Sequence, residues 1–372
     1  MRIKEKTKVA LYPVFAYTMP VVRYLMKYRS DIEIVELLSP PGSCGCGKDA
    51  GFFDNREELG KLIIPFSDTD TELWENLWLL HYESLGFTEE RKRQSVYAPM
   101  INIATRNHKR ILNNLSDKHG ITSVKPATSI STIVHNTKAI KRFGTLNPIK
   151  QFTVFVGGIV GLDDSFEVFL NLYGELSKHA RVTAFSTSKN AEICGVTDLN
   201  SVVNSNLYSE NNKVFEIEKI ITGTSDETKA DIILIHLEEA LLPFSDTQTS
   251  GFGIIPYLFS KIVSPDYFVC CLPYGYSNPL FLKECATGLK GCLGFSPDRW
   301  HLSNAMLDYT IVSNVIDAGL IHIPMDLIEH SIRNVRSHGI NIGSDVSEMY
   351  LHETVSGILQ AYKDNQLIDS II

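Results

Sequence analysis

The sequence has little of the positive charge that nucleic-acid binding requires. Its 372 residues include 35 Lys and Arg against 43 Asp and Glu, so the formal net charge is −8. Phosphate backbones are bound by basic faces. The short basic runs at residues 91–93 and 138–142 are more typical of solvated helix faces than of a binding stripe. We therefore expect no nucleic-acid partner.

A hydrophobic run long enough to cross a membrane is also missing. The longest apolar stretches, such as residues 154–162, are interrupted by glycine and fall well short of the ~20 residues that span a bilayer. The first residues, Met-Arg-Ile-Lys-Glu-Lys-Thr-Lys, lack the apolar segment of a secretion signal. The seven cysteines are odd in number, which argues against a disulfide framework. We expect a cytoplasmic protein with reduced thiols and no membrane partner.

The order of apolar segments predicts an α/β protein with two domains, because the chain is longer than a single hydrophobic core usually supports. In the first domain, residues 1–148, the pattern predicts strands at 9–14, 32–38 and 61–65 and helices at 19–28, 73–81 and 99–115. In the second, residues 149–372, it predicts strands at 151–156, 181–186, 231–237 and 267–272, with helices that include 166–179 and 345–362. The alternation indicates a Rossmann-like domain followed by a larger, mostly parallel domain that resembles a degenerate P-loop fold.

The strand predicted at residues 151–156 leads into a glycine-rich loop and then a helix. Such a helix start presents N–H groups and a positive dipole end to an anion. A Walker A loop, Gly-x4-Gly-Lys-Ser/Thr, adds a lysine for the outer phosphates and a hydroxyl for magnesium. Counted from Gly158, this frame puts Asp163, Asp164 and Ser165 at the glycine, lysine and hydroxyl positions. The loop is therefore either a structural turn capped by Asp163 or Asp164 or a degenerate ligand site. The candidate residues are Gly157, Gly158, Gly161, Asp163, Asp164 and Ser165.

A second element would complete a nucleotide site. Residues 232–237 are an apolar strand that ends in Glu238 and Glu239, as a Walker B strand delivers a carboxylate that could hold a metal or activate water. Parallel strands also commonly end in polar residues, so a purely structural interpretation stays open. A nucleotide with magnesium is the cofactor that these two elements would serve.

The cysteines do not have the spacing of a structural zinc site, which uses well-separated pairs such as Cys-x2-Cys, so we predict no metal. Cys270 and Cys271 lie inside an apolar strand and are expected to pack as small hydrophobic residues. A glycine loop carries further candidates for a reactive or ligand-binding role, Cys44, Cys46, Lys48 and Asp49. An ordinary surface loop is the alternative there. Residues 294–304 suit either a binding loop or a helix start with Ser296 as cap.

Three segments carry a resemblance to a known family. They are the strand Leu11-Tyr12-Pro13, the loop from Ser39-Pro40-Pro41-Gly42 to Gly47-Lys48-Asp49-Ala50-Gly51, and the Gly157-Gly158 loop. Together they resemble the clostridial peptide maturation system proteins, which are encoded beside bacteriocin-like precursor peptides and a radical SAM maturase. The resemblance implies an accessory role in making a ribosomally synthesised, modified peptide, with the precursor peptide and the maturase as partners. The alternative is a nucleotide-dependent peptide-modifying enzyme that uses the Gly157 loop for phosphate.

Overall fold

The computed structural model describes residues 6–54, 56–82, 93–113, 146–160, 164–243, 253–308 and 319–369. The chain divides into two compact units, Met1–Leu146 and Asn147–Ile372, which are called unit 1 and unit 2 below. Within the described ranges, no helix combines the length and apolar character needed to cross a membrane. Each unit is built on a parallel sheet, so the predicted α/β fold class is confirmed.

Unit 1 contains a five-stranded parallel sheet in the order β3-β2-β1-β4-β5. Its strands are β1 (Thr7–Tyr12), β2 (Ile32–Ser39), β3 (Ile63–Pro65), β4 (Asn76–Leu79) and β5 (Arg110–Asn113). Its helices are α1 (Met19–Tyr28) and α3 (Ala98–Arg106), with short helices η1 (Ala16–Thr18), η2 (Ala50–Phe53), η3 (Phe66–Asp68), η4 (Thr71–Leu73) and η5 (Arg93–Tyr97). This strand order matches five of the six strands of the Rossmann order 3-2-1-4-5-6. The turn after β1, residues 13–18, contains no glycine, so it lacks the dinucleotide fingerprint.

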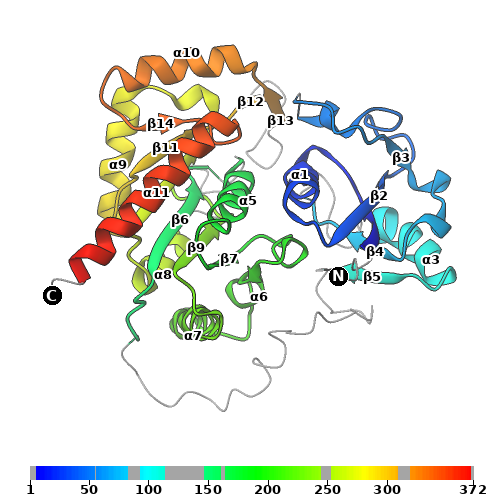
Figure 1. Ribbon diagram of the computed structural model, residues 1–372, viewed down its shortest axis with the longest axis horizontal. Coiled ribbons are helices and arrows are strands. Elements are labelled where there is room, and N and C mark those ends of the chain that lie inside the picture. The colour runs from blue at the N-terminus through cyan, green and yellow to red at the C-terminus, as the bar shows by residue number, and fades with distance from the viewer. Residues whose placement is uncertain are drawn as a thin grey trace. The chain divides into compact units, whose positions relative to one another are not determined.

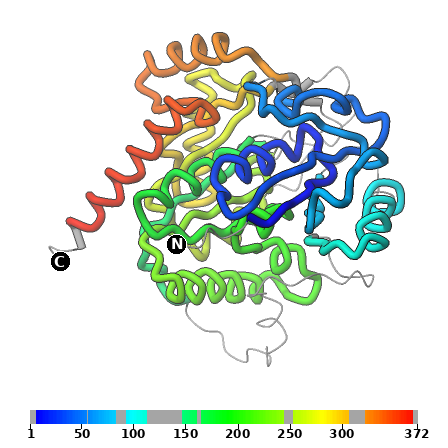
Figure 2. Tube along the Cα trace, turned by 45° about the vertical axis from the view of Figure 1, so that its right-hand side comes forward, coloured from blue at the N-terminus to red at the C-terminus, as the bar shows by residue number. Residues whose placement is uncertain are grey.

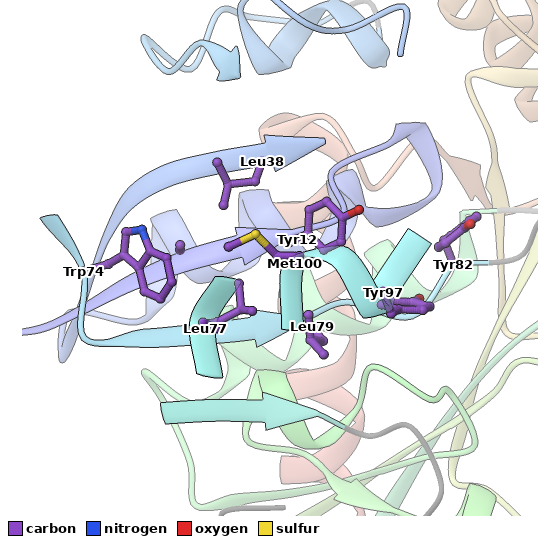
Figure 3. Close-up of a cluster of buried hydrophobic side chains, with 10 residues drawn as sticks. Tyr12, Leu38, Trp74, Leu77, Leu79, Tyr82, Tyr97 and Met100 are labelled. Carbon is purple, nitrogen blue, oxygen red and sulfur yellow. The ribbon is translucent and has the colours of Figure 1, made fainter. Parts of the chain in front are cut away.

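One hydrophobic cluster of unit 1 lies between the sheet and α3. Tyr12, Trp74 and Leu77 from the strand side pack with Met100 and Tyr97 (Figure 3). Tyr97 donates its hydroxyl to the carbonyl of residue 80 at 2.8 Å, and Tyr12 donates to the carbonyl of residue 96 at 2.8 Å. Each buried ring thus finds a hydrogen-bond acceptor, as buried tyrosines require.

Two predicted helices of unit 1 differ from the structure. Residues 73–81 do not form a helix. Asn76–Leu79 is the strand β4, a short apolar run buried between β1 and β5, and such a run gives no periodicity that separates strand from helix. The helix predicted at 99–115 stops at Arg106. Asn107 ends it, and β5 follows with Ile111 and Leu112.

Unit 2 contains a seven-stranded parallel sheet in the order β14-β11-β10-β6-β9-β7-β8. Its strands are β6 (Phe152–Gly158), β7 (Val182–Ser186), β8 (Thr197–Asp198), β9 (Ile232–Leu237), β10 (Tyr267–Leu272), β11 (Arg299–Leu302) and β14 (Ile342–Gly343), and β12 (Ala305–Asp308) and β13 (Gly319–His322) form a separate antiparallel pair. Its helices are α5 (Ser165–Leu176), α6 (Asn200–Val203), α7 (Glu210–Thr228), α8 (Ile254–Ile262), α9 (Pro279–Leu293), α10 (Met325–Arg336) and α11 (Glu348–Asp369), with η6 (Glu192–Cys194) and η7 (Tyr274–Tyr276).

Helices cover both faces of the unit 2 sheet. α5 packs on β6 and β9 and against the long helix α11 on one face, while α7, α8 and α9 follow one another along the other face (Figures 1 and 2). Strands buried on both sides read as continuous apolar runs. All residues of β6, β9 and β10 are buried, including Cys270 and Cys271, as predicted for those two cysteines.

The segment 294–304 does not begin a helix, because its central residues form the strand β11. Gly294, at φ 94°, ends α9 in the left-handed conformation that glycine adopts without strain. Residues Arg299–Leu302 then form β11, in which all four residues are buried. Arg299 and His301 interrupt the apolar run of β11, so the hydrophobic pattern did not predict a strand here. Both side chains belong to the site described next.

Candidate functional site

The candidate site of unit 2 lies where the strand connections diverge. β6 and β10 are neighbours, but the chain leaves β6 toward β7 on one side and leaves β10 toward β11 on the other. Ligands of open parallel sheets bind at the carboxyl edge beside such a switch point. The Gly157 loop lies at this edge, and Ser165 begins α5 directly after it. Gly161 and Asp163, two of the predicted site residues, lie outside the described residues.

Gly157, near the end of β6, leaves room for a neighbouring side chain of the protein. A Cβ on Gly157 would lie 3.3 Å from the side chain of Leu241. The backbone N–H of Leu241 donates to the carbonyl of Gly158 at 2.9 Å, and that of Leu242 donates to Ile159 at 3.1 Å. The chain that follows β9 therefore lies directly on the glycine pair. Gly157 permits this close approach, a structural reason for glycine that needs no phosphate.

Asp164 reaches a buried histidine that the sequence did not pair with it. Nε2 of His301, on β11, is 3.0 Å from Oδ1 of Asp164. On the other side of the ring, the backbone N–H of Asp345 donates to Nδ1 at 2.8 Å, and Asp345 Oδ2 is 3.6 Å from Nδ1. Arg299 Nη2 and Thr354 Oγ1 donate to Oδ1 of Asp345 at 3.3 and 2.6 Å. A continuous chain of polar contacts thus links the start of α5 to the loop before α11.

These partners determine which ring nitrogen of His301 carries a proton. Because Nδ1 accepts an N–H, the ring in this arrangement holds its proton on Nε2 and donates it to Asp164. Burial lowers the pKa of His301, but the charge and hydrogen bond of Asp164, together with Asp345, outweigh burial and raise the pKa to about 10. A second proton on Nδ1 would displace the amide of Asp345 and turn the ring nitrogen toward Oδ2. His301 is thus a buried, carboxylate-bound imidazole.

Ser165 is engaged by a second buried histidine. Its Oγ is 3.2 Å from Nε2 of His236, on β9, and Nδ1 of the same ring is 2.9 Å from Oγ of Ser186. The rings of Phe166 and Phe169 lie 5.2 and 5.3 Å from the imidazole. Burial lowers the pKa of His236 to about 3, so the ring is neutral and a weak base. A weak base makes the Ser165 contact an anchor for α5 rather than an activated nucleophile.

Glu239, one of the predicted carboxylates, is also held by a neighbour. Thr187 Oγ1 donates to Oε2 of Glu239 at 2.8 Å and accepts the backbone N–H of Glu238 at 2.9 Å. Burial raises the pKa of Glu239 above its ordinary value, and the Thr187 hydrogen bond only partly offsets this. Thr187 thus links Glu239 to the backbone of Glu238 at the end of β9.

These contacts do not fit a magnesium nucleotide. The residue in the lysine position, Asp164, carries a carboxylate and contacts His301, while the hydroxyl in the metal position, Ser165, contacts His236. The loop lies where a phosphate loop would lie, but the side chains in the lysine and hydroxyl positions contact buried histidines instead.

The candidate loop of unit 1 is folded around Asp49. Its carboxylate accepts the backbone N–H groups of Gly51, Leu59 and Lys61 at 2.8, 2.8 and 2.9 Å. Burial raises the pKa of Asp49, but these N–H groups outweigh it and hold the pKa below its ordinary value. Cys46 and Asp49 also bridge to Ile63 and Leu62, so the loop covers the edge of β3. Asp49 is therefore a scaffold residue of this loop.

The other candidates in that loop lie nearer to solvent. Cys44 is exposed, whereas Cys46 is half-buried, with Sγ 3.2 Å from Ser43 Oγ and 3.6 Å from the carbonyl of Pro40. Lys48 Nζ lies 3.5 Å from the centroid of the Phe52 ring, a cation–π contact. The structure thus places Cys44, Cys46, Lys48 and Asp49 on one rigid turn without bringing the two thiols and the carboxylate into a shared ligand set.

Comparison with known proteins supports the α/β fold. No protein-family model matches the sequence, and no curated protein matches it. The crystal structure of a DUF1611 family protein from Anabaena variabilis is similar, with a TM-score of 0.55 and 13% identity, covering 95% of this chain and 100% of that one. A GTPase from Pyrococcus abyssi, in its apo form, matches over 58% of this chain and 84% of its own, at 13% identity and a TM-score of 0.28. The first likeness supports an α/β fold, and the second is too weak to carry an argument.

Proposed function

We propose that this protein is a cytoplasmic accessory protein in the maturation of a ribosomally synthesised, modified peptide, and that it binds the precursor peptide or its radical SAM maturase. In this proposal, the P-loop-like unit 2 is a scaffold that does not hydrolyse nucleotide. The observation that carries the scaffold role is the contact of Asp164 with His301 at 3.0 Å, because the side chain in the lysine position is a carboxylate held inside the protein.

The peptide-maturation role itself is supported by the sequence resemblance, which includes residues 39–51. That segment forms the rigid turn around Asp49, with Cys44 exposed and Lys48 against Phe52. A turn whose shape is fixed by backbone hydrogen bonds loses little conformational entropy when a partner binds. This is a property that a peptide- or protein-binding surface benefits from.

Pull-down of the full chain with the precursor peptide and the radical SAM maturase that the resemblance predicts beside its gene tests this role. We expect recovery of one or both partners, with weaker recovery by Phe52→Ser, which removes the exposed ring of the turn. Lys283→Ser, an exposed change on α9, serves as the control. Recovery of neither partner by the unchanged chain would reject the proposal.

The second candidate, a nucleotide-dependent peptide-modifying enzyme, is favoured by one observation: α5 begins at Ser165, directly behind the end of β6, where a helix N-terminus attracts phosphate. Titration calorimetry with ATP or GTP and magnesium separates the candidates. Heat that Gly158→Trp abolishes would support the enzyme. We expect no heat from the unchanged chain, and none from Asp164→Lys, because the Ser165 and Glu239 contacts remain.

A further inference from the structure

Asp345 presents two groups to the same ring nitrogen of His301, and the two make opposite demands on it. The backbone N–H of Asp345 donates to Nδ1 at 2.8 Å, which requires an Nδ1 without a proton. The carboxylate oxygen Oδ2 of Asp345 lies 3.6 Å from Nδ1 and could accept a proton from it. Among the described residues, Oδ2 is buried without a hydrogen-bond partner. The neutral ring therefore leaves a buried acceptor unused, which costs free energy.

The other contacts of the ring direct a second proton to Nδ1. Nε2 faces Oδ1 of Asp164 at 3.0 Å, so this nitrogen already carries the first proton. The charge and hydrogen bond of Asp164 favour the positively charged ring and raise the pKa of His301, with Asp345 acting in the same direction. The charged and titratable groups around the ring and its partners are Asp164 before α5, Tyr267 and Cys271 on β10, Arg299 on β11, Arg336 on α10, Asp345 before α11, and Tyr350 and Glu353 on α11.

Asp345 also connects this ring to α11. Its other carboxylate oxygen, Oδ1, accepts from Thr354 Oγ1 on α11 at 2.6 Å and from Arg299 Nη2 at 3.3 Å. Because Oδ1 is held from two sides, Oδ2 stays beside the ring, and the backbone amide is the group that must move when Nδ1 gains a proton. This amide lies in the segment that leads into α11, and α11 packs against α5 (Figure 1).

We propose that His301 is a proton-operated switch with two arrangements. In the neutral arrangement, Nδ1 accepts the N–H of Asp345. When Nδ1 takes up a proton from solvent, it donates to Oδ2 of Asp345, and the amide of Asp345 is released. The two arrangements differ at the segment before α11, so a charge that changes beside Asp164, at the start of α5, is transmitted to that segment. The switch is independent of whether the protein serves peptide maturation.

NMR of the full chain with nitrogen-15 in its histidine rings and backbone tests the switch between pH 5 and pH 11. We expect the Nδ1 signal of His301 to change from the protonated to the unprotonated position as the pH rises, and the amide signal of Asp345 to move at the same pH. The chain with His301→Gln identifies the ring signals. His236 is the internal control, because it is equally buried but contacts hydroxyls, and its ring should stay neutral throughout.

Asp345→Asn keeps the backbone N–H and removes the charge of Oδ2. The pH of half-protonation of His301 should fall by about one to three pH units, whereas Asp31→Asn, in an exposed pair of unit 1, should leave it unchanged. A His301 ring that stays in one protonation state over the whole range would overturn the proposal, and so would an Asp345 amide that does not respond when the ring titrates. Both readings come from the unchanged chain, so they decide the question even where Asp345→Asn fails to fold.

Discussion

Two histidines lie at the carboxyl edge of the unit 2 sheet. They are equally buried but differ in their hydrogen-bond partners and in their pKa. His236 on β9 and His301 on β11 are both 0% exposed. Two serine hydroxyls and two phenylalanine rings surround His236, whereas two aspartates bind His301. The pKa falls to about 3 in the first case and rises to about 10 in the second.

Hydrogen-bond partners, rather than the depth of burial, set the pKa of these two imidazoles. Hydroxyls cannot compensate a buried positive charge, so desolvation alone decides the state of His236. Carboxylates can compensate it, and they make His301 part of an ionic network with Arg299 and Asp345. The two histidines are thus held in place differently, His236 by neutral partners and His301 by charged ones.

Removing a carboxylate from the network around His301 should have the largest effect. Asp345→Ala leaves Arg299, whose side chain is only 4% exposed, without its buried partner, and breaking such a pair costs about 3–5 kcal/mol. Urea unfolding at neutral pH measures the change in the free energy of unfolding. The control is Asp31→Ala, which breaks an exposed pair with Arg29 and should cost about 0–1 kcal/mol. Similar losses in both variants would show that the network adds nothing through burial.

Much of the fold follows from the sequence, because buried strands and amphipathic helices carry their own patterns. The helix at Met19–Tyr28 and the strand at Tyr267–Leu272 are placed as predicted. β4 was missed because Trp74, Leu77 and Trp78 also suit a helix face. β11 was missed because Arg299 and His301 break its apolar run. In each case the tertiary partners decide what the local pattern leaves open.

The site was predictable only in part. The sequence pointed to Asp164 and Ser165 from the phosphate-loop frame, yet their partners, His301 and His236, come from strands 137 and 71 residues away. A single sequence gives no pairing between such distant positions. One signal was present: a charged or titratable side chain within an apolar strand, as in Ile-His236-Leu or Trp-His301-Leu, needs a buried partner.

Acid should destabilise the protein because unfolding allows His236 to take up a proton. The folded-state pKa of His236 lies near 3, below the unfolded value of 6.5, so its contribution to stability is present above about pH 6.5 and is lost as the pH falls toward 3. One proton taken up on unfolding corresponds to about 1.4 kcal/mol per pH unit. His236→Gln removes this titration, so the difference in unfolding free energy between the two chains should shrink as the pH falls. Parallel curves from pH 7 to pH 4 would contradict a neutral His236.

Alkali should destabilise the protein through His301, whose folded-state pKa is shifted in the opposite direction from that of His236. The folded-state pKa of His301 is raised to about 10 from 6.5, so its contribution is fully present below about pH 6.5 and is lost as the pH rises through 10. His301→Gln should therefore flatten the loss of stability between pH 7 and pH 10. If the amide of Asp345 keeps Nδ1 free of a second proton throughout, the two curves will run in parallel, and His301 will prove to be neutral in the folded protein.

The smallest effect is expected from a single hydroxyl beside His236. Ser186→Ala removes the contact at 2.9 Å to Nδ1 and the acceptor for the backbone N–H of Ser188 at 3.0 Å, and an unsatisfied buried polar group costs about 1–3 kcal/mol. Ser356→Ala is the matched control, because Ser356 contacts His352 at 3.4 Å on the exposed face of α11, where water replaces the lost partner. A loss confined to Ser186→Ala, measured by urea unfolding at neutral pH, would show that hydroxyls hold His236 in place. Equal stability of both variants would leave the phenylalanine rings as its main support and sharpen the contrast with His301, which depends on charge.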